Sequence, residues 1–231
     1  MTANAAGPAS GWEEFVADLD REILPIYAEH ERRFDPDAVH GRIHICRSVI
    51  FSECMGRFYV NNRLGQIDFY AVRVATAFHD SGRKANGIDL WEDDSSRNCS
   101  EYVGRTSSRS GDADYAKYVA KLILKYGRKD LNKQIVQDAD VLEIMRPSCG
   151  HGGIKGFRRE FLGFAGSQDP VAPQIADANA IRETLIQEAW AWIQHTEGMK
   201  AHLRTSSAYM SDLLTELRKG CERYPMLSSV L

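Results

Sequence analysis

The stretch Phe78-His79-Asp80-Ser81-Gly82-Arg83 stands at the end of an apolar run with helical spacing, where a glycine is well placed to stop a helix. An adjacent His-Asp pair is common by chance, so its meaning depends on the flanking segments. His44 lies upstream and Asp140 lies downstream, which gives the order His44, His79, Asp80, Asp140. Two imidazoles and two carboxylates form a mixed nitrogen and oxygen ligand set. Such a set suits a divalent transition metal, Mg²⁺ or Mn²⁺.

Apolar side chains recur with a helical period along most of the chain, and almost no segment alternates as a strand does. The sequence therefore predicts an all-α fold. Asp35-Pro36, Asp68, Asp112 and Asp130 are helix start signals, because aspartate caps helices and proline fits the first turn. Pro25 is expected to kink or end the first helix. The expected helices cover residues 10–27, 35–59, 68–79, 95–105, 112–123, 130–144, 154–164, 175–203 and 206–221.

Several candidate site residues take their expected positions from these helices and the loops between them. His40 and His44 are four residues apart within the second expected helix, so they should share one helix face. The polar segment 81–94 is expected to be a loop that carries Glu92. His151 lies among glycines in a second expected loop.

The length of 231 residues suits one domain with a helical extension. We expect a flexible tail at residues 1–9, a catalytic core at 10–165, and a C-terminal helical extension at 166–231 that packs on the core. No apolar run reaches membrane-spanning length, and the start of the chain lacks a secretory signal. The net charge of -3 gives no bulk attraction to nucleic acid. Five widely spaced cysteines are expected to be free thiols in a reducing compartment, which indicates a cytoplasmic location.

The ordered motifs resemble the HD superfamily of metal-dependent phosphohydrolases over about residues 40–145. His40, His44 and Arg47 match its His-x-x-x-His-x-x-Arg pattern, and the Ala-Asp-x-Leu pattern is matched at 139–142. The resemblance implies an HD-domain-like helical core with additional C-terminal helices. It also implies one or two divalent metal ions, which could be Mn, Fe, Ni, Co, Zn or Mg. The implied metal ligands are His44, His79, Asp80 and Asp140, with Asp138 as a rival of Asp140.

Three further residues are candidates for contact with a substrate phosphate. Arg83 occupies the place where HD proteins often carry a lysine, and a guanidinium there can hold a phosphate in bidentate fashion. Lys84 is a second candidate and His151 a third. The alternative for Arg83 and Lys84 is that both are solvated charges. Asp80 is expected to take part in catalysis as well, as a bridge between metal and water.

The segment after the His-Asp pair resembles a second, narrower family. His-Asp-Ser-Gly-Arg is followed by Gly87-x-Asp89-x-Trp91-Glu92-x-x-Ser95, a pattern similar to the phosphodiesterase domain of the SidE-family Legionella effectors. Those domains act on ADP-ribosylated or phosphoribosylated ubiquitin and share the HD-like helical core. The resemblance implies catalysis by histidine and glutamate side chains without an obligatory metal. His40 would then be the nucleophile or acid/base and Glu92 the glutamate, with His151 as the candidate for a second histidine.

The sequence leaves three hypotheses. The first is an HD-type phosphohydrolase or phosphodiesterase that hydrolyses a nucleotide-like phosphoester with metal-activated water. The second is a SidE-like, metal-independent phosphodiesterase that acts on an ADP-ribose-derived diester. The third is a non-catalytic nucleotide-binding module. The expected partner is a nucleotide or phosphodiester small molecule, or a modified protein, and no membrane.

Overall fold

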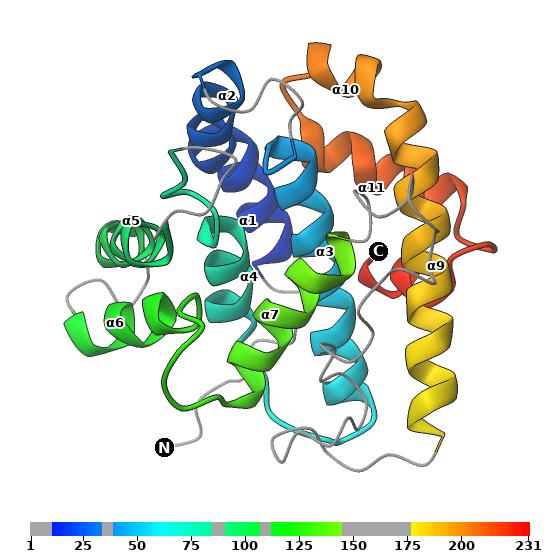
Figure 1. Cartoon of the computed structure of the whole chain (residues 1–231). Helices are drawn as coiled ribbons and strands as arrows, with labels where there is room; N and C mark the ends of the chain where they lie inside the picture. Colours follow the sequence, from blue (N-terminus) through cyan, green and yellow to red (C-terminus); the bar gives the residue numbers. More distant parts are fainter. Residues whose placement is uncertain (1–10, 34–38, 85–90, 107–111, 145–176) are drawn as a thin grey trace.

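The computed structural model describes residues 11–33, 39–84, 91–106, 112–144 and 177–231 (Figure 1). Within these ranges every regular element is a helix and no strand occurs, so the predicted all-α fold is confirmed. The N-terminal elements are α1 (Trp12–Asp18), the π-helix η1 (Leu19–Ile23), α2 (Leu24–Arg33), α3 (Arg42–Asn61) and α4 (Phe69–Phe78). They are followed by α5 (Trp91–Thr106), α6 (Ala113–Lys121), α7 (Leu131–Glu143), α9 (Ala178–Gly198), α10 (Lys200–Thr205), α11 (Tyr209–Lys219) and the 3-10 helix η4 (Leu227–Val230).

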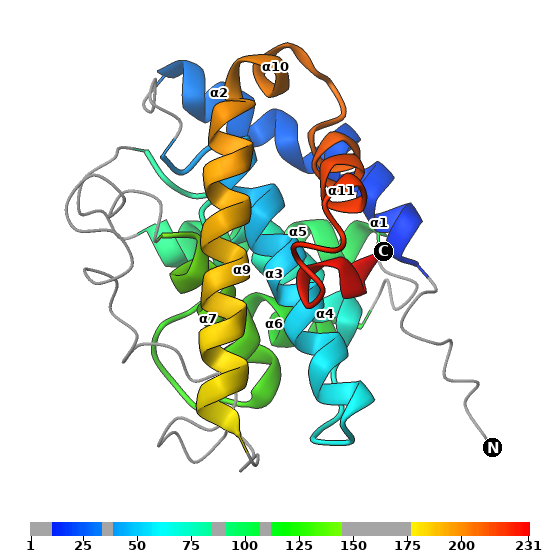
Figure 2. The same ribbon diagram turned by 90° about the vertical axis from the view of Figure 1, so that its right-hand side faces the viewer.

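Helix α3 is the centre of the fold. Most of its residues are buried, including polar ones such as His44, Arg47 and Glu53, so it is enclosed rather than lying on the surface. In Figure 1, α4 and α7 lie on one side of it, while α9 and α11 lie on the other. Figure 2 shows α9 running across the same side of α3 as the C-terminal segment. The polar side chains of α3 are therefore held between two layers of helices.

Three of the predicted N-caps are confirmed, and each aspartate accepts a backbone N–H of the first turn. Asp68 caps α4 through the N–H of Ala71, and Asp130 caps α7 through that of Lys133. Asp112 caps α6 in the same way. Each cap satisfies a donor that the helix itself leaves unpaired. Two of these helices, α4 and α7, carry candidate site residues.

The predicted start of the second helix is wrong within the described residues. Helix α3 begins at Arg42, so His40 lies in the turn before it and not on the helix face of His44. The reason is a partner from α2: Glu31 accepts the backbone N–H of Arg42 at 2.6 Å and pairs with its guanidinium. A Cβ at position 41 would collide with the Glu31 carboxylate, so Gly41 permits this close approach.

Two further helix boundaries differ from the prediction. Helix α5 begins at Trp91 and not at residue 95, which places Glu92 in its first turn and not in a loop. Acidic side chains there complement the helix dipole. Pro25 does not end the first helix, because α2 continues to Arg33. The π-helical segment just before Pro25 is a local adjustment of the backbone next to a residue without an N–H.

The C-terminal segment contacts α3 at several points. The ring of Trp192 packs edge-on against Phe51, with 5.9 Å between the ring centroids. The thiol of Cys54 donates to the carbonyl of Met226 at 3.0 Å. The single expected helix 175–203 is wrong: the structure has two helices, α9 and α10, which are separated at Met199 and end at Thr205. The expected helix 206–221 is found as the shorter α11, and the expected helix 154–164 lies outside the described residues.

No described helix is both long enough and apolar enough to cross a lipid bilayer. Four cysteines in the described ranges are free thiols: Cys46, Cys54, Cys99 and Cys221. Cys149 lies outside them. The cytoplasmic location therefore stays a prediction.

Candidate active site

Three helices bring four of the predicted residues to one point. His44 lies on α3, His79 is the C-cap of α4, Asp80 follows it, and Asp140 lies on α7. The Nε2 atoms of His44 and His79 are 3.0 Å apart. Oδ2 of Asp80 lies 3.4 Å from Nε2 of His44 and 3.6 Å from that of His79. Oδ1 of Asp140 lies 3.6 Å and 3.4 Å from the same two nitrogens. We call these four residues the His-Asp cluster.

The second ring nitrogen of each clustered histidine is held by an acceptor. Nδ1 of His44 is 2.5 Å from Oε2 of Glu143, and Nδ1 of His79 is 2.7 Å from the carbonyl oxygen of Thr76. A ring nitrogen that faces a carboxylate or carbonyl carries the proton as donor. Held in this way, the imidazoles turn their Nε2 atoms toward the cluster, as metal-binding histidines do.

The spacing of these atoms fits a divalent metal ion. Four ligands at about 2.1 Å from a tetrahedral ion lie about 3.4 Å from one another. The five separations between 3.0 and 3.6 Å given above are close to this value. The ligand atoms of His44, His79 and Asp140 all lie within 4.8 Å of one another, and so do those of His40, His44 and Asp80. The donor set, two imidazoles and two carboxylates, suits Zn²⁺, Mn²⁺, Fe²⁺, Co²⁺ or Ni²⁺. The geometry of these residues therefore suits a divalent ion, and the presence of a metal stays a prediction.

The cluster is strongly polarised. Burial opposes a charge on His44, but the nearby Glu143 and Asp80 carboxylates outweigh it and raise the pKa of His44 to about 9. The pKa of His79 is also raised, because the Asp80 and Asp140 carboxylates outweigh the effect of burial. Burial opposes ionisation of Asp80, but the histidines around it hold the pKa of Asp80 well below its usual range. The pKa of Asp140 is also lowered against burial, chiefly by His79. Two carboxylates thus remain ionised and favour positive charge between them.

His40 stands beside this cluster and shares Asp80 with it. Its Nδ1 lies 2.7 Å from Oδ2 of Asp80, and the two rings of His40 and His44 are 5.6 Å apart. The other oxygen of Asp80, Oδ1, forms an ion pair with Nε of Arg83 at 2.9 Å. The side chains of His40, Asp80 and Arg83 are all nearly buried. A carboxylate that holds one imidazole nitrogen fixes the tautomer and direction of the ring, as in catalytic triads.

Arg83 and Lys84 have different surroundings. The guanidinium of Arg83 stacks 3.5 Å above the ring of Trp91, and the ammonium of Lys125 lies 4.6 Å from the same ring. Lys84 is largely exposed and pairs with Asp94 at 2.7 Å. Lys84 thus lies at the surface in an ion pair, whereas Arg83 is joined to the site through Asp80, and contact of either residue with a substrate phosphate stays a prediction.

Glu92 follows Trp91 in the first turn of α5, so its helix reaches the site through the Trp91 stack with Arg83. Its carboxylate pairs with Lys125 at 3.3 Å and is partly exposed. Asp138 does not replace Asp140: it accepts a hydrogen bond from Gln134 on its own helix at 2.6 Å. His151 lies outside the described residues.

Two buried residues of the site were missed as functional candidates by the sequence analysis. Glu143 is fully buried and contacts both His44 and Arg47. Arg47 was noted only as part of a motif. Both follow cluster residues by three positions on a helix, Asp140 on α7 and His44 on α3, so they lie one turn along the same faces. That spacing was the available signal.

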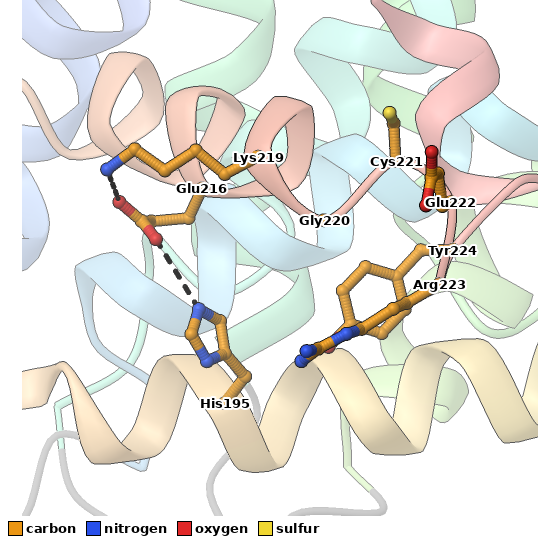
Figure 3. A pocket seen from close by; sticks show the side chains of 8 residues that line it. All are labelled: His195, Glu216, Lys219, Gly220, Cys221, Glu222, Arg223 and Tyr224. Carbon is orange, nitrogen blue, oxygen red and sulfur yellow. Dashed lines mark hydrogen bonds and ion pairs between the residues drawn. The ribbon is translucent and has the colours of Figure 1, made fainter.

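Figure 3 shows a separate pocket of about 490 Å³ where α9 meets α11 and the segment after it. Its lining residues are His195, Glu216, Lys219, Gly220, Cys221, Glu222, Arg223 and Tyr224. Within it, Glu216 accepts from Lys219 at 2.6 Å and faces Nε2 of His195 at 3.5 Å. None of the predicted catalytic or metal-binding residues lines this pocket.

Comparison with known proteins separates the two family resemblances. The family model described as the SidE phosphodiesterase (PDE) domain matches residues 39–204 of the 231, well over half of the chain. The matched segment includes the turn of His40, the whole His-Asp cluster and helix α9. No curated protein and no solved structure matched. The comparisons give no support to the HD superfamily resemblance. The chain belongs to the SidE phosphodiesterase domain family.

Proposed function

We propose that this protein is a phosphodiesterase in which His40, oriented by Asp80, attacks the phosphorus of a phosphodiester. The observation that carries the proposal is the 2.7 Å contact between Nδ1 of His40 and Oδ2 of Asp80. That contact fixes a proton on Nδ1 and leaves Nε2 as the nucleophilic atom. The ion pair between Arg83 and the other oxygen of Asp80 keeps the carboxylate in place. Membership of a phosphodiesterase domain family supports the reaction class.

The chemistry balances in two steps. Nε2 of His40 forms a bond to phosphorus, the ester bond to the leaving oxygen breaks, and that oxygen takes a proton from solvent and leaves as an alcohol. Water then attacks the phosphoramidate, the nitrogen–phosphorus bond breaks, and His40 is restored. Splitting one difficult displacement into two is the advantage of a covalent intermediate. The role left for Glu92 is to take a proton from the resolving water.

The His-Asp cluster supports a second candidate mechanism in which water is activated by metal. Nε2 of His44 and His79 and the carboxylates of Asp80 and Asp140 would hold the ion. The observation that favours it is the set of separations from 3.0 to 3.6 Å among these atoms. A bound divalent ion would supply positive charge and Lewis acidity next to an anionic phosphodiester. The chain's own part is to present the four ligand atoms from three packed helices.

For the substrate we propose an ADP-ribose-derived phosphodiester, either as a small molecule or attached to a protein such as ubiquitin. The support is the family resemblance of the segment from His79 to Ser95. Arg83, stacked on Trp91 next to the site, is the group proposed to face the substrate phosphate. A nucleotide-like phosphoester without ADP-ribose is the alternative substrate.

The test is a hydrolysis assay with ADP-ribosylated ubiquitin and with bis(4-nitrophenyl) phosphate, each with chelator and with added Zn²⁺ or Mn²⁺. Turnover that persists in chelator and is lost in His40→Gln supports the histidine mechanism. Turnover that requires the added ion and is lost in Asp140→Asn supports the metal mechanism. Saturable nucleotide binding without turnover under any condition would overturn both and favour a non-catalytic binding module.

A further inference from the structure

We propose that Glu143 is a positioning residue that sets which nitrogen of His44 carries the ring proton, and that helix α9 holds Glu143 in place through Arg47. The proton position on His44 can be tested whether or not the protein turns over a substrate. Its effect on catalysis rests on the proposed function. The inference starts from a chain of buried contacts that joins the cluster to the C-terminal helices.

The carboxylate of Glu143 lies between two donors, the Nδ1–H group of His44 and the guanidinium of Arg47. Its Oε2 is 2.5 Å from Nδ1 of His44, and its Oε1 accepts from Nη2 of Arg47 at 2.5 Å. Glu143, His44 and Arg47 are each 0% exposed. These contacts lie in the core between α3 and α7, and the Glu143 carboxylate is the group that faces Nδ1 of His44 and favours a proton on that atom.

Arg47 is in turn fixed by α9. Its Nη1 donates to Oγ1 of Thr196 at 2.9 Å, and its Nη2 donates to Oε1 of Glu197 at 2.9 Å. The guanidinium therefore ties Glu143 on α7 to two successive residues of α9. A buried arginine is a donor at every nitrogen and cannot release its proton. Oε1 of Glu143 must therefore act as an acceptor toward Nη2 of Arg47.

This arrangement predicts a specific result for Glu143→Gln. The amide has one accepting and one donating end, and Arg47 can face only the accepting end. The NH₂ group is then left against Nδ1 of His44, which must become an acceptor. The ring proton has to sit on Nε2, the atom that points to His79 at 3.0 Å. The substitution thus reverses the tautomer while it keeps the size and shape of the side chain.

The experiment is long-range ¹H–¹⁵N NMR of the ring nitrogens in the full chain after treatment with chelator. His44 is assigned by comparison with His44→Gln. In the parent, Nδ1 of His44 should carry a proton that exchanges slowly and resonates far downfield. In Glu143→Gln, Nδ1 should show the shift of an unprotonated nitrogen. A parent in which Nδ1 is unprotonated, or a variant in which it stays protonated, overturns the proposal.

Two further variants separate positioning from general damage to the fold. Asp138→Asn changes another buried acid on α7 that contacts Gln134, and it should leave the His44 tautomer as in the parent. Thr196→Val removes one anchor of Arg47 but keeps Glu143, so the tautomer should persist. Where Glu143→Gln does not fold, an unprotonated Nδ1 in the parent still overturns the proposal.

The link to the site has its own readout. Loss of the oriented His44 should weaken Zn²⁺ binding about 10- to 100-fold, the usual effect of removing a group that orients a ligand. It should lower kcat with little change in KM, since Glu143 contacts His44 and Arg47 rather than the ring of His40. An NMR result as predicted together with no turnover in the parent would retain the positioning role and reject the proposed function.

Discussion

Asp80 is the residue on which the site depends most, because its two oxygens serve different partners. Oδ2 faces His40, His44 and His79, while Oδ1 pairs with Arg83. The sequence could place Asp80 next to His79, but it could not show that one carboxylate serves both the nucleophile candidate and the His-Asp cluster. That information lies in the turn that brings His40 forward, which sequence analysis had assigned to a helix.

Asp80→Asn should lower kcat by about 10²- to 10⁴-fold, because an amide no longer fixes the proton on Nδ1 of His40. The measurement is steady-state hydrolysis of bis(4-nitrophenyl) phosphate. Asp94→Asn is the matched control: it weakens the ion pairs of Asp94 with two exposed cations, Lys84 and Arg97, and should leave kcat within about twofold. Equal rates for Asp80→Asn and the parent would remove Asp80 from the mechanism.

Asp140→Asn should weaken Zn²⁺ binding by at least about tenfold, because one of two ligand carboxylates is replaced by a neutral amide. Asp138→Asn should leave Zn²⁺ binding unchanged, since Asp138 accepts from Gln134 on its own helix, whereas Asp140 faces Nε2 of His44. Isothermal titration of the chelator-treated protein with ZnSO₄ measures both. If Asp138→Asn is the variant that loses binding, the assignment of the ligand is wrong.

At the scale of elements, the sequence predicts a helix start correctly where the capping side chain is the residue just before that helix. Asp68, Asp112 and Asp130 each accept from their own helix, and each was predicted from sequence. The start of α3 was missed because its cap comes from Glu31 on another helix. Tertiary partners of this kind leave no periodic trace in the sequence, so the turn of His40 had to be seen in the structure.

Asp68→Ala should destabilise the fold more than Asp112→Ala does. Both lose an N-cap, which costs about 1 kcal/mol. Asp68 also accepts the Tyr115 hydroxyl at 3.0 Å, and that donor would lose its partner, which adds about 1 kcal/mol. Urea unfolding followed by circular dichroism gives both values. Equal losses would mean that the Tyr115 contact adds nothing to the stability of the fold.

At the scale of the whole molecule, the C-terminal helices are joined to the site rather than merely placed beside it. Arg47 contacts Thr196 and Glu197 on α9, and Phe51 contacts Trp192 one turn earlier. The sequence predicts helices in this segment from their periodicity, and the division of the chain into a core and an extension stays a prediction. The pairing of Arg47 with Glu143 joins residues 96 positions apart, so periodicity could not reveal it.

Trp192→Ala should lower the free energy of unfolding by about 3–5 kcal/mol, because the indole is fully buried between α9 and α3. Trp190→Ala, two residues away and only partly buried, is the control and should cost clearly less. Thermal and urea unfolding measure both. Similar small losses for the two variants would show that α9 contributes little to the stability of the core around the site.

The central claim, attack by His40 on phosphorus, is tested most directly by rapid quench and mass spectrometry of the protein during turnover of bis(4-nitrophenyl) phosphate. The account predicts a 4-nitrophenyl phosphoryl group on the peptide that contains His40. It also predicts that the group accumulates further in Glu92→Gln, in which water resolves the intermediate more slowly. Full turnover with no adduct on His40 in either protein would contradict the claim and leave metal-activated water at the His-Asp cluster as the mechanism.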